Sequence, residues 1–260
     1  MVKKKGKGKK KEKSRYVSAS GKPKVSVCTP TYNRRKFIPN LIRAYQAQDY
    51  PPELLEWIIV DDGEDCVEDL FKDVPTVKYF RVEEKMKLGR KRNFMHTKCT
   101  GEIIVYMDDD DYYPYNRVSH AVNKLRSRHH VLAAGSSAIF LYFQNLNKIY
   151  KFGPYGPNHS TGGTFAFKRR LLGQTRYNDE AELAEEKEFL KNYTIPFIQL
   201  DPMKTILVFA HDKNTFDKNN LLKNPNPKVV KETNMKLKTF FGKDKKLLEF
   251  YKNFEWEGKV

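Results

Sequence analysis

Cysteines and long apolar runs are scarce in this chain, and each scarcity argues against a class of protein. The 260 residues contain three cysteines, Cys28, Cys66 and Cys99, with no C-x-x-C spacing, which argues against a disulfide scaffold and a structural zinc site. No apolar run is long enough to span a bilayer, and no secretory apolar region follows the basic start. We therefore expect a cytoplasmic protein that is soluble or peripherally associated with a membrane.

Glycine-rich phosphate loops are also missing. The segment Gly89 to Arg92 contains neither G-x-G-x-x-G nor G-x-x-x-x-G-K-[ST], so neither a Rossmann dinucleotide site nor a P-loop is supported. Hydrophobic residues make up 39% of the chain and aromatic residues 13%, which is enough to form a core. The length suits one large domain or two small ones.

Positive charge is concentrated at the N-terminus. The first 24 residues hold ten Lys, one Arg and one Glu, a net charge of +10 out of +17, which leaves +7 for the rest of the chain. Because Lys3 to Lys13 has almost no apolar residue, we expect residues 1–23 to be a disordered basic tail. Such a tail contacts anionic lipid or another acidic partner, or serves only to keep the protein in solution; we expect no specific nucleic acid.

Short apolar runs alternate with helical periodicity between residues 24 and 127. This pattern is typical of an α/β fold with a Rossmann-like, mostly parallel central sheet and helices on both faces. The predicted strands are 25–29, 54–60, 77–82 and 103–107, and the predicted helices are 35–48, 88–99 and 115–125.

The pattern changes after residue 130. Residues 131–150 are aromatic and β-rich, which predicts a smaller antiparallel part, and later strands are expected at 164–167 and 206–209. Residues 180–193 predict an acidic helix, and the Lys-rich segment 216–260 has helical spacing. We therefore expect a catalytic domain at 24–215 and a C-terminal helical extension at 216–260 packed on it.

Acidic residues follow two of the predicted strands. Asp61 and Asp62 end the second strand, and the run Asp108 to Asp111 follows the fourth. The carboxyl ends of parallel strands lie on one edge of a sheet, so these carboxylates should converge there. Their mutual repulsion needs a cation, and oxygen ligands suit Mg²⁺ or Mn²⁺, which usually bring a phosphate with them. A solvated acidic loop is the plain alternative.

Four segments in this order resemble the family 2 glycosyltransferases of the GT-A fold. Val25 to Arg34 resembles their opening strand, and Ile59 to Gly63 resembles the end of their second strand. Gly89 to Asn93 resembles their G-x-x-x-A-R-N helix start, with Lys91 where a small residue is common, and Tyr106 to Asp111 resembles their D-x-D-D metal motif. The resemblance covers about residues 24–215.

The resemblance implies a nucleotide-sugar site. Asp61 or Asp62 would accept hydrogen bonds from the base, and Asp108 or Asp109 would hold the ribose. Arg90 would reach the nucleotide or its diphosphate, because guanidinium groups suit phosphate oxygens. The residues implied to line the base pocket are Thr29, Pro30 and Tyr32.

The resemblance also implies a metal and a catalytic base. Asp110 would coordinate Mn²⁺ or Mg²⁺, with Asp108 as the alternative register and His211 completing the shell. Glu186 stands where the family has its Asp base, so this chain departs from the usual residue. Glu185 is the next candidate, ahead of Glu182 and Asp179, and an acidic solvated helix is the plain alternative.

The predicted function is metal-dependent, inverting transfer of a sugar from a nucleoside-diphosphate donor, by default a UDP-sugar, to a hydroxyl of a glycan acceptor. Two alternatives remain open. A sugar-phosphate nucleotidyltransferase would share the acidic edge but should have a glycine-rich first loop, and Thr29 to Asn33 has no glycine. A non-catalytic protein that binds nucleic acid or another anionic partner would rely on the basic tail and would leave the acidic clusters unexplained.

Overall fold

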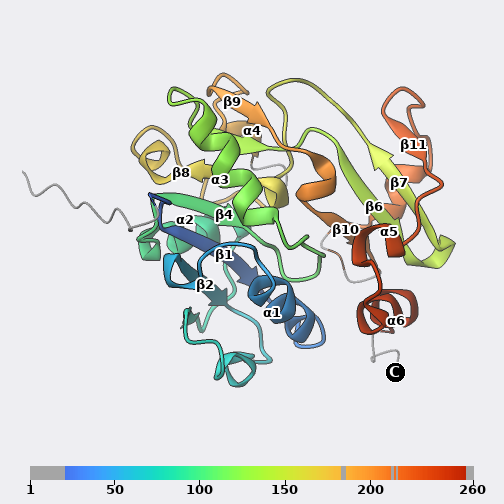
Figure 1. Cartoon of the computed structure of the whole chain (residues 1–260), viewed down its shortest axis with the longest axis horizontal. Coiled ribbons are helices and arrows are strands. Elements are labelled where there is room, and N and C mark those ends of the chain that lie inside the picture. The colour runs from blue at the N-terminus through green and yellow to red at the C-terminus, as the bar shows by residue number, and fades with distance from the viewer. Residues whose placement is uncertain (1–20, 183–185, 212–213, 215, 256–260) are drawn as a thin grey trace, which may run out of the picture.

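The chain folds into two neighbouring β-sheets with helices packed on them (Figure 1). The structure is a computed structural model that describes residues 21–182, 186–211, 214 and 216–255. The predicted basic tail therefore lies almost entirely outside the described residues. Within the described part of the chain, no helix has the length and apolar character needed to cross a membrane.

The larger sheet has seven strands in the order β3-β2-β1-β4-β8-β5-β9. Neighbouring strands run parallel except at β8, which is antiparallel to both β4 and β5. The prediction of a mostly parallel α/β sheet is confirmed. The strands are β1 (Val25–Thr31), β2 (Leu55–Asp61), β3 (Val77–Arg81), β4 (Ile103–Tyr106), β5 (Ala133–Gly135), β8 (Ala166–Lys168) and β9 (Phe197–Gln199).

Helices cover both faces of this sheet. The helices α1 (Ile38–Gln46) and α3 (Arg117–Ser127) share a core with one face, and α2 (Leu88–Lys98) shares a core with the other. Successive side chains of a strand point to opposite faces. Val27 accordingly packs in the first core and its neighbour Cys28 in the second.

The smaller sheet has four strands in the order β10-β6-β7-β11. The pair β6 and β7 forms an antiparallel hairpin, β11 is antiparallel to β7, and β10 is parallel to β6. The hairpin confirms the smaller antiparallel part. The strands are β6 (Ile139–Phe143), β7 (Lys148–Phe152), β10 (Leu207–Ala210) and β11 (Val230–Glu232), and α5 (Lys238–Phe241) and α6 (Lys245–Asn253) pack on them.

Two predicted helical segments differ from the structure. In the acidic segment 180–193, the described helix is only α4 (Glu186–Phe189). It ends because residues 191–193 take left-handed backbone conformations, with φ between 49° and 63°. In the C-terminal segment, α5 and α6 are present as predicted, but residues 230–232 form the edge strand β11.

A buried carboxylate joins the strands at the amino edge of the larger sheet. Glu56 on β2 accepts hydrogen bonds from the Ser26 hydroxyl at 2.6 Å and from the Thr100 backbone N–H at 2.6 Å. Lys78 on β3 and Lys24 before β1 place ammonium groups 2.7 Å and 3.1 Å from its Oε2. Burial alone would raise the pKa of Glu56, but these hydrogen bonds, that of Lys78 first, hold it well below its ordinary value.

Candidate active site

The carboxyl ends of β1, β2 and β4 form one edge of the larger sheet, and this edge faces the smaller sheet (Figure 1). The strand register pairs Thr31 with Asp61 and Cys28 with Tyr106. Because these strands are parallel, the segments that follow them emerge next to one another. The topology therefore brings the three predicted motifs to one place.

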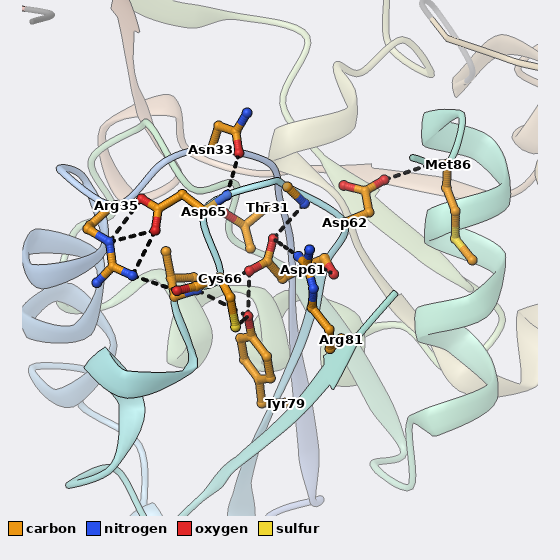
Figure 2. Close-up of polar contacts among 12 residues, drawn as sticks. Thr31, Asn33, Arg35, Asp61, Asp62, Asp65, Cys66, Tyr79, Arg81 and Met86 are labelled. Atoms are coloured by element: carbon orange, nitrogen blue, oxygen red, sulfur yellow. Dashed lines mark hydrogen bonds and ion pairs between the residues drawn. The ribbon is translucent and has the colours of Figure 1, made fainter. Parts of the chain in front are cut away.

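Asp61 closes the loop that follows β2 (Figure 2). Its side chain is buried, its Oδ1 accepts from the Gly63 N–H at 2.9 Å, and its Oδ2 accepts from the Val67 N–H at 3.2 Å. The Tyr79 hydroxyl donates to the same Oδ2. Both oxygens of Asp61 are thus engaged, and they hold the loop and Tyr79 in place.

Asp62 forms a buried ion pair with Lys91, which lies on α2. The other oxygen of Asp62 accepts from the Met86 N–H at 2.7 Å (Figure 2). Lys91 also donates to the Thr31 carbonyl at 3.2 Å, and its Nζ lies 6.0 Å from the centre of the Tyr32 ring. A carboxylate, an ammonium and an aromatic face are thus adjacent. These groups can pair with the N–H, the carbonyl and the ring face of a nucleobase such as uracil or guanine.

Thr29 lies behind this site rather than in it. It is fully buried, and its hydroxyl donates to the Met107 carbonyl at 2.6 Å and accepts from the Trp57 indole N–H at 2.9 Å. These bonds tie β1 to its two neighbours in the sheet. Pro30, the next residue, is partly exposed. The geometry gives Thr29 a supporting role, and Pro30 is the residue of this pair that lies at the surface.

Arg90 and Arg92 lie on different sides of α2, because two residues in a helix differ by about 200°. Arg90 is exposed and lines a cavity of about 250 Å³ together with Met86. Arg92 is buried, with its guanidinium 4.3 Å over the Tyr106 ring and one nitrogen 3.7 Å from Asp108 Oδ1. Arg92, which the sequence analysis did not select, is therefore the arginine of α2 that reaches the acidic run.

Asp108 is the first carboxylate after β4. Its backbone N–H donates to the Tyr113 hydroxyl oxygen at 2.6 Å, which fixes the turn. Gly163 closes over the carboxylate, since a Cβ on Gly163 would lie only 2.6 Å from Asp108 Oδ2. A larger residue at 163 would have to displace this side chain.

The neighbouring carboxylates repel the negative charge of Asp109. Burial, and then the neighbouring Asp110, raise its pKa to about 7. Arg34, whose Nε lies 3.7 Å from Asp109 Oδ1, acts in the opposite direction. A cluster of this kind favours the approach of a further cation.

Asp110 meets His211 at the edge of the smaller sheet, although 101 residues separate them in sequence. Asp110 Oδ2 lies 3.1 Å from His211 Nε2 and 3.1 Å from Asn214 Nδ2. Burial favours the neutral acid, but the hydrogen bond to His211 and the charges of Lys218 and Arg34 lower the pKa of Asp110 below its ordinary value. The pairing of Asp110 with His211 that the resemblance implied is present in the structure.

Asp111 anchors β10. Its Oδ1 accepts from the Phe209 N–H at 2.8 Å, two residues before His211. The rings of Phe37 and Phe209 each lie 5.1 Å from the His211 ring. Asp111 and this aromatic packing together position His211 beside Asp110.

Asp110 and His211 offer one carboxylate oxygen and one imidazole nitrogen, a donor set that Mn²⁺ accepts. Within the described residues, no three His, Cys, Asp or Glu side chains are grouped so as to hold an ion by themselves. The residues therefore fit a metal whose coordination is completed by substrate phosphate oxygens. Asp108, the other predicted ligand, has Arg92 beside it instead.

Glu186, the first residue of α4, is joined to the acidic run through two glycines. Its Oε1 accepts from the Gly162 N–H at 2.6 Å, and the next residue, Gly163, abuts Asp108. The candidate base and Asp108 thus flank one short 3₁₀ turn, Gly162–Thr164. Glu185, the other candidate base, lies outside the described residues.

The chain matches the sequence profile described as Glycosyl transferase family 2 over residues 26–182, more than half of its length. It belongs to this family. The matched region contains the ends of β1, β2 and β4, α2 and the two glycines beside Asp108. His211 and Glu186 lie beyond it.

Two bacterial glycosyltransferases are similar to this family 2 chain in sequence. Poly(ribitol-phosphate) beta-N-acetylglucosaminyltransferase TarS of Staphylococcus aureus is 31% identical over 99 residues, which are 34% of this chain and 16% of TarS. GalNAc(5)-diNAcBac-PP-undecaprenol beta-1,3-glucosyltransferase of Campylobacter jejuni is 34% identical over 96 residues, which are 34% of this chain and 30% of that protein. The matches thus span less than a third of either relative.

Solved structures of glycosyltransferases share the fold. The mannosyltransferase PcManGT of Pyrobaculum calidifontis, in complex with GDP-Man and Mn²⁺, superposes with a TM-score of 0.60 at 19% identity, covering 74% of this chain and 59% of that one. A fragment of S. aureus TarS in complex with UDP gives a TM-score of 0.55 at 21% identity, covering 72% and 60%. The expected GT-A fold is confirmed.

Residues that the sequence analysis left unassigned complete the site of this family 2 protein. Arg34 lies 3.7 Å from Asp109 and 3.8 Å from Asp110, and Asn214 contacts Asp110. Arg34 ends the first motif, Val25 to Arg34, and Asn214 follows His211 by three residues. The sequence signal for Asn214 is its position three residues after a candidate ligand, and the signal for Arg34 is its place at the end of a motif.

Proposed function

We propose that this protein is a metal-dependent, inverting glycosyltransferase that moves a sugar from a nucleoside-diphosphate sugar to a hydroxyl of a glycan acceptor. The observation that carries the proposal is the arrangement at the sheet edge. The Asp62–Lys91 pair lies beside Tyr32, the Asp110–His211 pair lies at the acidic run, and Glu186 lies across two glycines from it. The similar proteins support the assignment, since their names specify glycosyl transfer and their structures contain UDP or GDP-Man.

The base-binding end favours a pyrimidine donor. Uracil carries an N–H between two carbonyls, which matches an acceptor at Asp62 beside a donor at Lys91, with Tyr32 against the ring. Guanine also places an N–H beside a carbonyl, so GDP is the second choice. We propose a UDP-sugar as the donor, with Asp108 or Asp109 holding the ribose.

The diphosphate would lie over the acidic run. Asp110 and His211 would hold Mn²⁺ or Mg²⁺, which when bound supplies positive charge to the departing nucleoside diphosphate. Arg34 stands within 4 Å of Asp109 and Asp110, and Arg92 within 4 Å of Asp108. These two guanidinium groups limit the repulsion between the carboxylates and the incoming phosphates.

Glu186 supplies the general base. Its carboxylate accepts the proton of the acceptor hydroxyl as the oxygen attacks the anomeric carbon, and the bond to the diphosphate oxygen breaks on the opposite side. One displacement of this kind inverts the configuration. The Gly162 N–H, donating to Glu186 Oε1, holds the carboxylate in place while the second oxygen takes the proton.

The nucleotidyltransferase alternative lacks its expected glycine-rich first loop, and the family membership favours glycosyl transfer. We propose a cytoplasmic location, soluble or peripheral, in which the basic tail contacts anionic lipid or another acidic partner. The non-catalytic alternative predicts binding without turnover and without metal dependence, so one assay separates it from the enzyme.

The test is a panel of nucleoside-diphosphate sugars, with and without Mn²⁺, scored for nucleoside diphosphate release. Asp110→Ala should abolish the release, while Asp73→Ala, at an exposed site away from the edge, should leave it unchanged. Thermal stabilisation by the same donors measures binding separately. Absence of both release and stabilisation for every donor would refute the proposal.

A further inference from the structure

A second cavity lies at the opposite edge of the larger sheet, where β1 and β4 begin and β8 ends. Its volume is about 410 Å³, and its walls come from the segment before β1, the end of α3 and the end of β8. In Figure 1 this region is on the left, while the smaller sheet and α6 are on the right. The cavity is therefore separate from the candidate active site.

The lining of this cavity is strongly basic. It contains five Lys or Arg side chains and one histidine against a single carboxylate, that of Glu102. The Lys and Arg members are Lys22, Arg126, Lys168, Arg169 and Arg170, and the histidine is His129. The cavity also starts at residue 21, where the basic first 20 residues, with eight Lys and one Arg against one Glu, join the fold. The positive charge of the cavity therefore continues into the chain that precedes it.

Backbone carbonyls hold the cations around the cavity. Lys168 Nζ donates to the carbonyl of His129 at 3.0 Å, and Arg170 Nη2 donates to the same oxygen at 2.8 Å. Arg169 Nε donates to the Gly101 carbonyl at 2.8 Å. Each guanidinium has five N–H donors, so these bonds orient the arginines and leave further donors for a ligand.

The neighbouring positive charges affect the pKa of Lys168. Burial, and then the charge of Arg170, lower the pKa of Lys168 below its ordinary value. An anion in the cavity would relieve this repulsion. Forked guanidinium groups suit phosphate oxygens in particular, because two parallel N–H groups match two oxygens.

We propose that this basic cavity binds the phosphate group of an anionic lipid headgroup and so docks the amino edge of the sheet on a membrane surface. The inference does not depend on the donor chemistry, because none of the lining residues belongs to the catalytic edge. The phosphate chemistry is shared with a soluble phosphate compound. The lipid is the better source because the 20 residues that precede the cavity in the sequence carry a net charge of +8, and an anionic membrane surface attracts basic segments.

The experiment compares the full-length protein with an Arg126→Gln, Arg170→Gln double variant in sedimentation with vesicles. The vesicles contain phosphatidylcholine with or without phosphatidylglycerol. Two cations near an anionic surface should together change the partition coefficient about 30-fold. A Lys245→Ala, Lys246→Ala variant removes the same charge from exposed positions on α6 and should change it less than about threefold.

Both variants keep residues 1–20, so the comparison isolates the cavity from the basic segment. Unchanged melting temperature and unchanged donor hydrolysis show that the fold and the catalytic edge are intact. Equal vesicle binding by the wild type and the Arg126, Arg170 variant would overturn the proposal. Tight binding of inorganic pyrophosphate, lost in that variant and accompanied by no binding to anionic vesicles, would overturn the lipid source.

Discussion

Replacing Glu186 by Gln tests the mechanism most sharply, because the amide keeps one property of the carboxylate and loses the other. The Gln carbonyl can still accept the Gly162 N–H that Glu186 now accepts at 2.6 Å, so the turn beside Asp108 should stay in place. A neutral acceptor is weaker than a charged one by about 1 kcal/mol, which lowers the melting temperature by about 2–4 °C. The amide takes up no proton, so kcat should fall about 100- to 10,000-fold.

The assay is nucleoside diphosphate release under saturating donor, with donor affinity measured separately by calorimetry. Glu188→Gln, at an exposed position on the same helix, is the control and should retain full activity. Glu186→Asp should recover part of the rate lost in Glu186→Gln, since it restores a carboxylate that is one methylene shorter. A Glu186→Gln variant with a wild-type kcat would refute the assignment, and loss of activity in Glu185→Gln alone would move the base to that residue.

Three further predictions concern the nucleotide, the metal and the fold. Lys91→Met should weaken UDP binding about tenfold in calorimetry, since it removes the proposed carbonyl donor and leaves Asp62 without its ammonium partner. His211→Ala should raise the Mn²⁺ concentration for half-maximal release at least about tenfold, and an unchanged titration would remove it from the metal site. Glu56→Gln should lower the free energy of unfolding by about 2–3 kcal/mol, because hydrogen bonds to a buried charge are lost. The pKa of Glu56 is depressed in the folded state, so its contribution is complete above the unfolded pKa of about 4.3 and is lost as the pH falls below it. Urea unfolding from pH 7 to pH 3 should therefore show a smaller acid loss in the variant.

The centre of the larger sheet was predictable because β1, β2 and β4 are buried on both faces. Ile58, Ile59 and Val60 form such a run in β2, and only a buried parallel strand accommodates it in this context. Short elements with mixed patterns were less predictable. The sequence predicts β11 as part of a helical extension, because its three residues, Val230–Glu232, carry too little periodicity to show that they pair with β7.

The location of the site was predictable from the same topology, but the role of each residue was not. Strand direction alone places Asp62 and Asp110 at one edge. It does not show that Thr29 is enclosed between Met107 and Trp57, or that Arg92 rather than Arg90 faces the acidic run. These outcomes depend on side-chain partners from distant segments, which a single sequence does not specify.

The acidic edge is tolerated because its carboxylates are divided among different partners. Asp61 is satisfied by its own loop, and Asp111 is bonded to the backbone of β10. Asp62 is neutralised by Lys91. Asp108 to Asp110 remain at the site itself, where Arg34 and Arg92 supply only two guanidinium groups at 3.7–3.8 Å. Burial and the neighbouring Asp110 raise the pKa values of Asp109 and Asp111, so these partners compensate the charge of the run only in part. This partial compensation is expected if the remaining cation arrives with the substrate.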